Sequence, residues 1–209
     1  MSDRAALADA SRQVAAAGLV TGAAGNLSLR RGERMLITPR GGQLEAIDPR
    51  ECVEVALEDG STWAGSRPSS ESPLHRAVYA ATDAGAIVHT HSHFATVLST
   101  LVDELPPIHY AIHAFGGAVR VARYETFGTT ELADAVLEAL HGRTGALMAN
   151  HGAIVYGRDL PQAVGRAITL EWLASVYFHA RLAGSPHILT EADIDAVRDQ
   201  IHGLEAARR

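Results

Sequence analysis

The chain has 209 residues, enough for one domain with a sizeable core. Its formal net charge is −6, and its 18 basic residues form no basic stripe. This balance argues against nucleic acid or an acidic membrane as partner and favours a small molecule. The single cysteine, Cys52, excludes an intramolecular disulfide, and charges interrupt every long apolar run, so we expect a cytoplasmic protein that does not span a membrane.

Helical and strand patterns alternate along residues 1–209 without a linker or repeat, which predicts one α/β domain. Glycines and prolines separate the first strands, as in an antiparallel sheet. In chain order, we expect a helix at 4–17, strands at 26–29, 35–38 and 52–57, a helix at 70–82, a strand through 86–91, a helix at 92–101, a strand at 118–122, a helix at 129–140, strands at 145–149 and 153–156, and helices at 161–182 and 190–202.

Two histidines, His89 and His91, stand at the end of an apolar run that is typical of a buried strand. Residues two apart on a strand share a face and lie roughly 6.6 Å apart, so both imidazoles can reach one ion. His151, in another apolar stretch, supplies a third nitrogen, and a catalytic zinc ion typically takes three protein ligands. Ordinary histidines near a turn are the alternative. Imidazoles also accept Co²⁺, Ni²⁺, Mn²⁺ or Fe²⁺, so the sequence leaves the metal open.

A second group of polar residues, Ser69, Ser70 and Glu71, directly precedes a helical pattern. Hydroxyls and free amides at a helix N-terminus suit an anion such as phosphate or carboxylate. Simple helix capping is the alternative, because serine is a preferred N-cap residue. Glu71 and His75 lie four apart, a spacing that indicates a surface pair.

Two glycine-containing turns are further candidates for binding. One ends in Gly25 and Asn26, and the other follows a strand and contains Arg40 and Gly41. Glycine permits close backbone approach to a ligand, and an arginine fork binds oxyanions. Plain connecting turns are the alternative for each.

Several segments together resemble one family. They are GLVTGAAGNLS at 18–28, MLITPRG at 35–41, PSSE at 68–71, IVHTH at 87–91, PIHY at 107–110, ETFGTTEL at 125–132 and NHG at 150–152. In this order they resemble the class II aldolase/adducin family over nearly the whole chain, closest to its L-fuculose-1-phosphate aldolases.

The resemblance implies a three-layer α/β/α sandwich around a largely antiparallel central sheet, assembled as a homotetramer with shared active sites. It implies a zinc-type metal held by His89, His91 and His151. Glu71 would be the acid/base at the dihydroxyacetone phosphate carbon next to the carbonyl, with the negative charge stabilised by the metal as an enediolate.

The resemblance also implies how substrate is bound. Tyr110 would reach in from a neighbouring subunit to protonate the aldehyde oxygen, and Phe127 would shape the aldehyde pocket; from residue type alone, both aromatics would be placed in the core. The residues expected to bind phosphate are Gly25, Asn26, Gly41, Ser69 and Ser70.

Two positions depart from the family pattern. Arg40 replaces a small hydroxyl residue in the phosphate loop, and His202 stands where a mobile tyrosine is expected. We therefore expect a lyase that cleaves a ketose 1-phosphate to dihydroxyacetone phosphate and an aldehyde. The alternatives are decarboxylation of a keto or hydroxy acid, favoured by Arg40, and epimerisation or dehydration of a sugar phosphate. A noncatalytic adducin-like module would lack the ligand residues that this chain retains.

Overall fold

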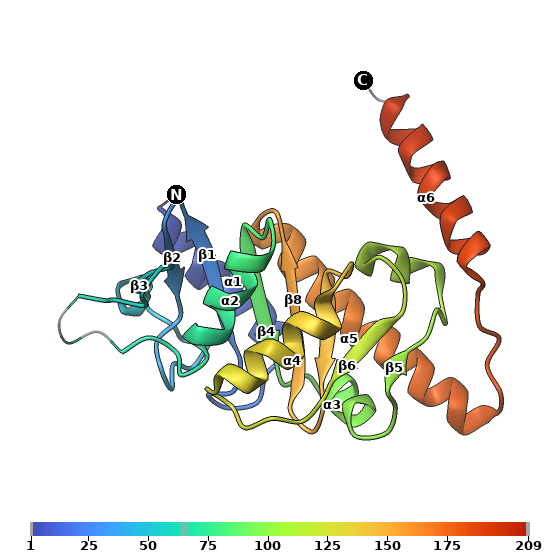
Figure 1. Cartoon of the computed structure of the whole chain (residues 1–209), viewed down its shortest axis with the longest axis horizontal. Coiled ribbons are helices and arrows are strands. Elements are labelled where there is room, and N and C mark those ends of the chain that lie inside the picture. The colour runs from blue at the N-terminus through green and yellow to red at the C-terminus, as the bar shows by residue number, and fades with distance from the viewer. Residues whose placement is uncertain (1, 64, 66, 208–209) are drawn as a thin grey trace.

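The computed structural model describes residues 2–63, 65 and 67–207. Its centre is an eight-stranded sheet with helices on both faces (Figure 1). The strands are β1 (Asn26–Arg31), β2 (Arg34–Ile37), β3 (Val53–Ala56), β4 (Ala86–Thr90), β5 (Glu104–Leu105), β6 (Val119–Ala122), β7 (Gly145–Met148) and β8 (Gly152–Gly157). The helices are α1 (Asp3–Ala16), α2 (Ser72–Ala81), α3 (His93–Ser99), α4 (Thr130–Leu140), α5 (Leu160–Ala183) and α6 (Glu191–Ala206), with short 3₁₀ turns η1 (Pro49–Glu51) and η2 (Tyr110–Phe115).

The strand order is β3-β2-β1-β4-β8-β7-β6-β5, and every pairing is antiparallel except that of β6 with β7. This confirms the α/β class with a largely antiparallel sheet. All five residues of β4 are buried, because both faces of the sheet are covered at its centre. The strand that leads to the paired histidines is therefore enclosed along its whole length.

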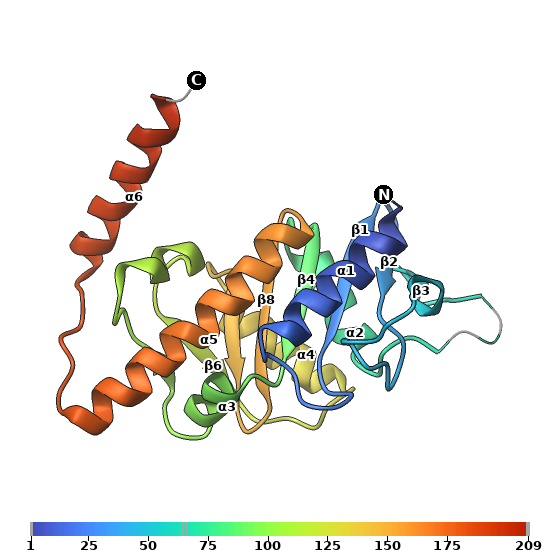
Figure 2. The same ribbon diagram turned by 180° about the vertical axis from the view of Figure 1, so that it is seen from behind.

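Helices α1 and α5 cover one face of the sheet, and α2 and α4 cover the other (Figures 1 and 2). Two groups of buried apolar side chains follow this division. One lies under α1, α3 and α5, and the other lies under α2 and α4. No helix within the described ranges is long and apolar enough to cross a membrane.

The predicted elements are all present, with ends shifted by a few residues. Helix α2 begins at Ser72 rather than residue 70, and the short β5 and both 3₁₀ turns were not predicted. Helix α6 begins with a reciprocal cap, in which Thr190 Oγ1 accepts from the Asp193 amide and Asp193 Oδ2 accepts from the Thr190 amide. Beyond its contact with η2, where Arg198 donates to the Gly116 carbonyl, α6 extends away from the body (Figure 1).

Cys52 is expected to resist thiol reagents in the folded protein. Its side chain is buried beside η1, and burial raises the pKa of the thiol to about 11. The thiolate that reacts is therefore scarce at neutral pH. Titration with a disulfide reagent should show a free thiol only after denaturant is added; rapid reaction of the native protein would contradict this burial.

Candidate active site

His89 and His91 project from the end of β4, as their spacing predicts. His89 is paired in register with Asn26 of β1 and Ile154 of β8, and its side chain is fully buried. Its Nδ1 lies 2.9 Å from the Ala153 carbonyl, which fixes Nδ1 as the donor. Nε2 is therefore the ring nitrogen that faces the cluster, and it lies 3.0 Å from Nε2 of His91.

His151 reaches the same point from the turn between β7 and β8. Asn150 adopts φ 54°, a left-handed conformation that asparagine tolerates better than most residues. A Cβ on Gly152 would meet the Thr90 carbonyl at 2.2 Å, so only glycine lets β8 approach β4 here. The His151 ring then stands 4.9 Å from that of His89 and 4.8 Å from that of His91, between centroids. These two backbone requirements explain why Asn150 and Gly152 flank His151.

Glu71 completes the cluster at the N-terminus of α2. Its Oε2 lies 3.0 Å from His89 Nε2 and accepts a 2.8 Å hydrogen bond from Asn26 Nδ2. Its Oε1 lies 3.4 Å from His151 Nε2. The carboxylate is buried, and Oε1 has no hydrogen-bond partner among the described residues. An unpartnered buried carboxylate oxygen indicates a missing cation or donor at this point.

The donor set fits a divalent cation. One atom each from Glu71, His89, His91 and His151 lies within 4.8 Å of the others. Three nitrogens and one carboxylate oxygen are the ligand types that zinc and related metals bind. These four residues could therefore hold such an ion, and the identity of the metal stays a prediction.

The titration behaviour of the cluster agrees with this arrangement. Burial, followed by repulsion from His89, lowers the pKa of His91 and of His151 to about 4, so both rings are neutral with free lone pairs at neutral pH. Burial raises the pKa of Glu71, but the His89 charge and the Asn26 hydrogen bond outweigh it and leave the carboxyl ionised. The negative charge needs a cation, which a bound metal would supply in place of a proton on His89.

A cavity of about 300 Å³ opens beside this cluster. It brings together all the residues predicted for phosphate, together with Arg40 and Phe127. Its full lining is Ala23, Ala24, Gly25, Asn26, Pro39, Arg40, Gly41, Ser69, Ser70, Glu71, His91, Tyr124, Glu125, Phe127, Asn150 and His151. Gly25 is required for this packing, because at φ 84° its Cβ would lie 2.9 Å from the His89 carbonyl. The roles predicted for these residues stay predictions, but their convergence is observed.

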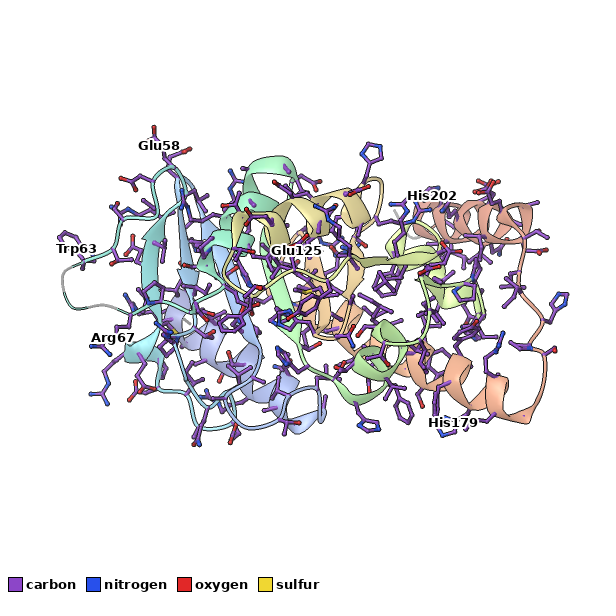
Figure 3. The ribbon with its side chains drawn as sticks, turned by 60° about the horizontal axis from the view of Figure 1, so that its bottom comes forward. Glu58, Trp63, Arg67, Glu125, His179 and His202 are labelled. Carbon is purple, nitrogen blue, oxygen red and sulfur yellow. The ribbon has the colours of Figure 1, made fainter. Side chains whose placement is uncertain are left out.

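Two predicted residues lie elsewhere. Tyr110 is 56% exposed in η2 and does not line the cavity of its own chain. His202 lies on α6, far from Glu125 at the cavity (Figure 3). The placement of Tyr110 and Phe127 in the core, expected from residue type, is wrong, since Phe127 is 63% exposed. The prediction that Glu71 and His75 form a surface pair is also wrong, because both side chains are buried.

Sequence reasoning missed several residues. Tyr124, Glu125 and Asn150 line the cavity but were not predicted. Glu125 and Asn150 lie in the segments 125–132 and 150–152 that resemble the family, and this position could have indicated them. Glu171 of α5 accepts from the backbone amides of Phe94 and Ala95, at 2.8 and 2.9 Å, and so caps α3 where Ser92 makes no side-chain cap. This long-range contact has no local sequence signal.

Comparison with known proteins agrees with the geometry. The profile of the Class II Aldolase and Adducin N-terminal domain matches residues 5–178. The chain belongs to this family. It is a class II aldolase, a lyase, and the resemblance found in the sequence is confirmed.

Individual relatives extend the similarity to most of the chain. A Rhodospirillum rubrum protein named 5-methylthioribulose-1-phosphate/5-deoxyribulose-1-phosphate aldolase is 42% identical over 197 residues, covering 93% of this chain and 88% of its own. An Escherichia coli L-fuculose phosphate aldolase is 37% identical over 186 residues, covering 88% and 86%. A solved L-fuculose 1-phosphate aldolase superimposes with a TM-score of 0.91 at 33% identity, covering 97% of this chain and 98% of its own. The three-layer aldolase fold is thereby confirmed.

Proposed function

We propose that this class II aldolase cleaves a ketose 1-phosphate to dihydroxyacetone phosphate and an aldehyde. The observation that carries the proposal is the single cavity in which Glu71 and two of the histidines face the turns that contain Ser69, Ser70 and Gly41. One end of that cavity suits a phosphate and the other suits acid–base chemistry at carbon. A divalent cation bound there would stabilise negative charge on the substrate's oxygens.

The chain's own residues account for the proton transfers. The bond between C3 and C4 breaks, and its electron pair stays on C3. Glu71 delivers a proton to C3 to complete dihydroxyacetone phosphate, and C4 leaves as the aldehyde carbon. The proton of the C4 hydroxyl leaves to solvent through a tyrosine hydroxyl, for which we propose Tyr110 of a neighbouring copy. The Glu71 carboxylate takes up from solvent the proton that it delivers to C3, so no proton is gained or lost overall. The Asn26 hydrogen bond orients the Glu71 carboxylate for its transfer.

The outer part of the cavity supports a substrate with an apolar end. Phe127 and Tyr124 line it, and both are 63% exposed, so their rings are available to a ligand. Aromatic rings bind methyl and thioether groups well. Together with the 42% identical relative, this supports 5-deoxyribulose 1-phosphate or 5-methylthioribulose 1-phosphate as substrate, with L-fuculose 1-phosphate as the comparison.

The test is release of dihydroxyacetone phosphate, measured with a coupled reductase, from these three sugars by purified protein loaded with Zn²⁺, Co²⁺ or Mn²⁺. We expect turnover with the 5-deoxy and 5-methylthio sugars. No release from any of the three with any metal would refute the proposal.

Arg40 favours a second candidate, decarboxylation of a keto or hydroxy acid. Its side chain is exposed at the cavity, and no carboxylate within the described ranges pairs with it. A guanidinium fork fits a carboxylate as well as a phosphate in geometry, so Arg40 also suits an acid substrate. Carbon dioxide release from a panel of such acids, without cleavage of any ketose 1-phosphate, would favour this candidate.

Arg40→Ala is expected to raise KM for the ketose 1-phosphate by about tenfold with little change in kcat, because the lost ionic hydrogen bonds involve the phosphate and not the reacting carbons. Steady-state kinetics measures both constants. Arg34→Ala, which removes an arginine paired with Glu54 on the far strands, is the matched control and should change neither. A fall in kcat at constant KM would contradict this role for Arg40.

The proposed role of Tyr110 requires an oligomer, and we propose a homotetramer. Tyr110 is exposed and packs against His109, whose ring also meets Trp172, itself 46% exposed. Such exposed aromatics are typical of an interface between subunits. An active monomer in sizing chromatography would exclude Tyr110 from the reaction.

A further inference from the structure

A row of polar contacts joins β1 to α2 and runs from the cavity into the protein. Asn26, Ser28 and Arg30 lie at alternate positions of β1, on the same face of the strand. Asn26 donates to Glu71, Ser28 Oγ lies 2.7 Å from His75 Nδ1, and Arg30 donates to the Tyr79 carbonyl at 3.0 Å. Ser28 Oγ also lies 2.8 Å from the Tyr79 hydroxyl. We name this row the β1–α2 seam.

The seam is possible because two repeats match. Alternate residues on a strand are roughly 6.6 Å apart, and residues four apart on a helix rise by about 6.0 Å. Glu71, His75 and Tyr79 are spaced by four and face the strand together. A displacement of α2 by one residue would break the contacts of the seam simultaneously. The seam therefore fixes where α2 begins, and Glu71 is the residue just before that beginning.

The interior of the seam is fully sequestered. Ser28 and His75 are 0% exposed and Tyr79 is 1% exposed. Burial lowers the pKa of His75 to about 3 and raises that of Tyr79, so both side chains are neutral. Buried polar groups without bulk water exchange their partners only at a large cost in free energy.

Counting protons gives the direction of the hydrogen bonds. A neutral Tyr79 must donate its proton, and Ser28 Oγ is its only partner among the described residues. Ser28 then donates to His75 Nδ1, so the ring proton of His75 is on Nε2, which has no partner among the described residues. The opposite direction would leave two groups unpaired, the Tyr79 proton and the lone pair of His75 Nε2, so the first direction costs less. One chain of donors therefore runs from Tyr79 through Ser28 to His75, which belongs to the same helix end as Glu71.

We propose that Ser28, His75 and Tyr79 are positioning residues that hold Glu71 at its place beside the three histidines. This rests on the proposed function for the role of Glu71 in proton transfer. None of the three lines the cavity or belongs to the donor cluster. They act by anchoring the start of α2 to β1, which itself pairs in register with the histidine strand β4 through Asn26 and His89.

The test compares Ser28→Ala with Ser11→Ala. Ser11 is also 0% exposed and hydrogen-bonded, to the Leu7 carbonyl within α1, but it has no connection to the seam. Both variants are loaded with Co²⁺, and its visible absorption reports the ligands around the ion independently of turnover. Steady-state kinetics and proton–deuterium exchange at C3 of dihydroxyacetone phosphate, followed by NMR, are measured on the same samples.

We expect Ser28→Ala to change the Co²⁺ absorption, to lower kcat by about tenfold and to slow the exchange similarly, with KM within about twofold, because a small displacement of an acid–base group affects the reaction more than binding. Ser11→Ala should match the wild type. Unchanged absorption and kcat in Ser28→Ala would overturn the proposal. If the wild type cleaves no sugar, the proposed function fails, but the absorption comparison still tests the positioning.

A second pair of variants tests whether hydrogen bonding carries the effect and covers failure of Ser28→Ala to fold. His75→Asn keeps a polar atom near the position of Nδ1, and His75→Leu removes it. We expect His75→Asn to retain the wild-type absorption and most of kcat while His75→Leu loses both. Equal behaviour of the two variants would overturn the proposal.

Discussion

Glu71→Gln is expected to lower kcat for ketose 1-phosphate cleavage by about 10³-fold, the scale of one general acid–base group. Glutamine has nearly the same size, and its amide can keep the hydrogen bond with Asn26, but it can neither give nor take a proton at C3. The three histidines remain, so the bound metal should stay near one equivalent per chain. Coupled kinetics and elemental analysis of the same sample measure the two effects.

The matched control is Glu54→Gln, because Glu54 is a carboxylate on β3 that pairs with Arg34 away from the cavity. It should keep wild-type kcat. Loss of the metal together with activity in Glu71→Gln would show that the carboxylate acts mainly as a ligand, and retention of kcat would remove it from proton transfer altogether.

The sequence predicted those parts of the site that depend on local periodicity. His89 and His91 were found because a strand repeats every two residues, and the 3.0 Å between their Nε2 atoms confirms that the two rings lie on one side. Spacing alone indicated His151 only weakly, because its approach depends on the pairing of β8 with β4 and on the left-handed conformation of Asn150. Contacts of this kind are set by tertiary structure, and spacing along the chain does not encode them.

The wrong predictions have physical causes. Glu71 and His75 looked like a surface pair because a polar helix face normally meets water. Here that face of the helix contacts Ser28, a polar residue of a buried strand. The sequence of the helix alone, or of the strand alone, therefore does not indicate that these residues are buried. Tyr110 and Phe127 were placed in the core because aromatic residues are usually buried, yet both are exposed. Residue type cannot distinguish a core position from a ligand-facing or subunit-facing one.

Removal of the metal with a chelator is expected to reduce cleavage to background, and addition of a divalent transition metal should restore it. The four donors lie within 4.8 Å of one another, and without an ion the charge of Glu71 is balanced only by His89. An ion that binds only the folded chain at a hundred times its dissociation constant adds about 2.7 kcal/mol of stability, which for this size corresponds to about 5 to 10 °C in Tm. Calorimetry of the chelated and reloaded protein measures the shift.

His151→Ala should reproduce the chelated state, because the two remaining imidazoles and Glu71 leave the ion with one ligand fewer on its exposed side. His141→Ala, at an exposed position after α4, is the matched control and should keep metal, Tm and activity. If the chelated protein kept full activity with no metal found by elemental analysis, proton transfer by Glu71 alone would have to carry the reaction. The buried, unpartnered Oε1 argues against that outcome, because it indicates a carboxylate placed to share a cation with the histidines.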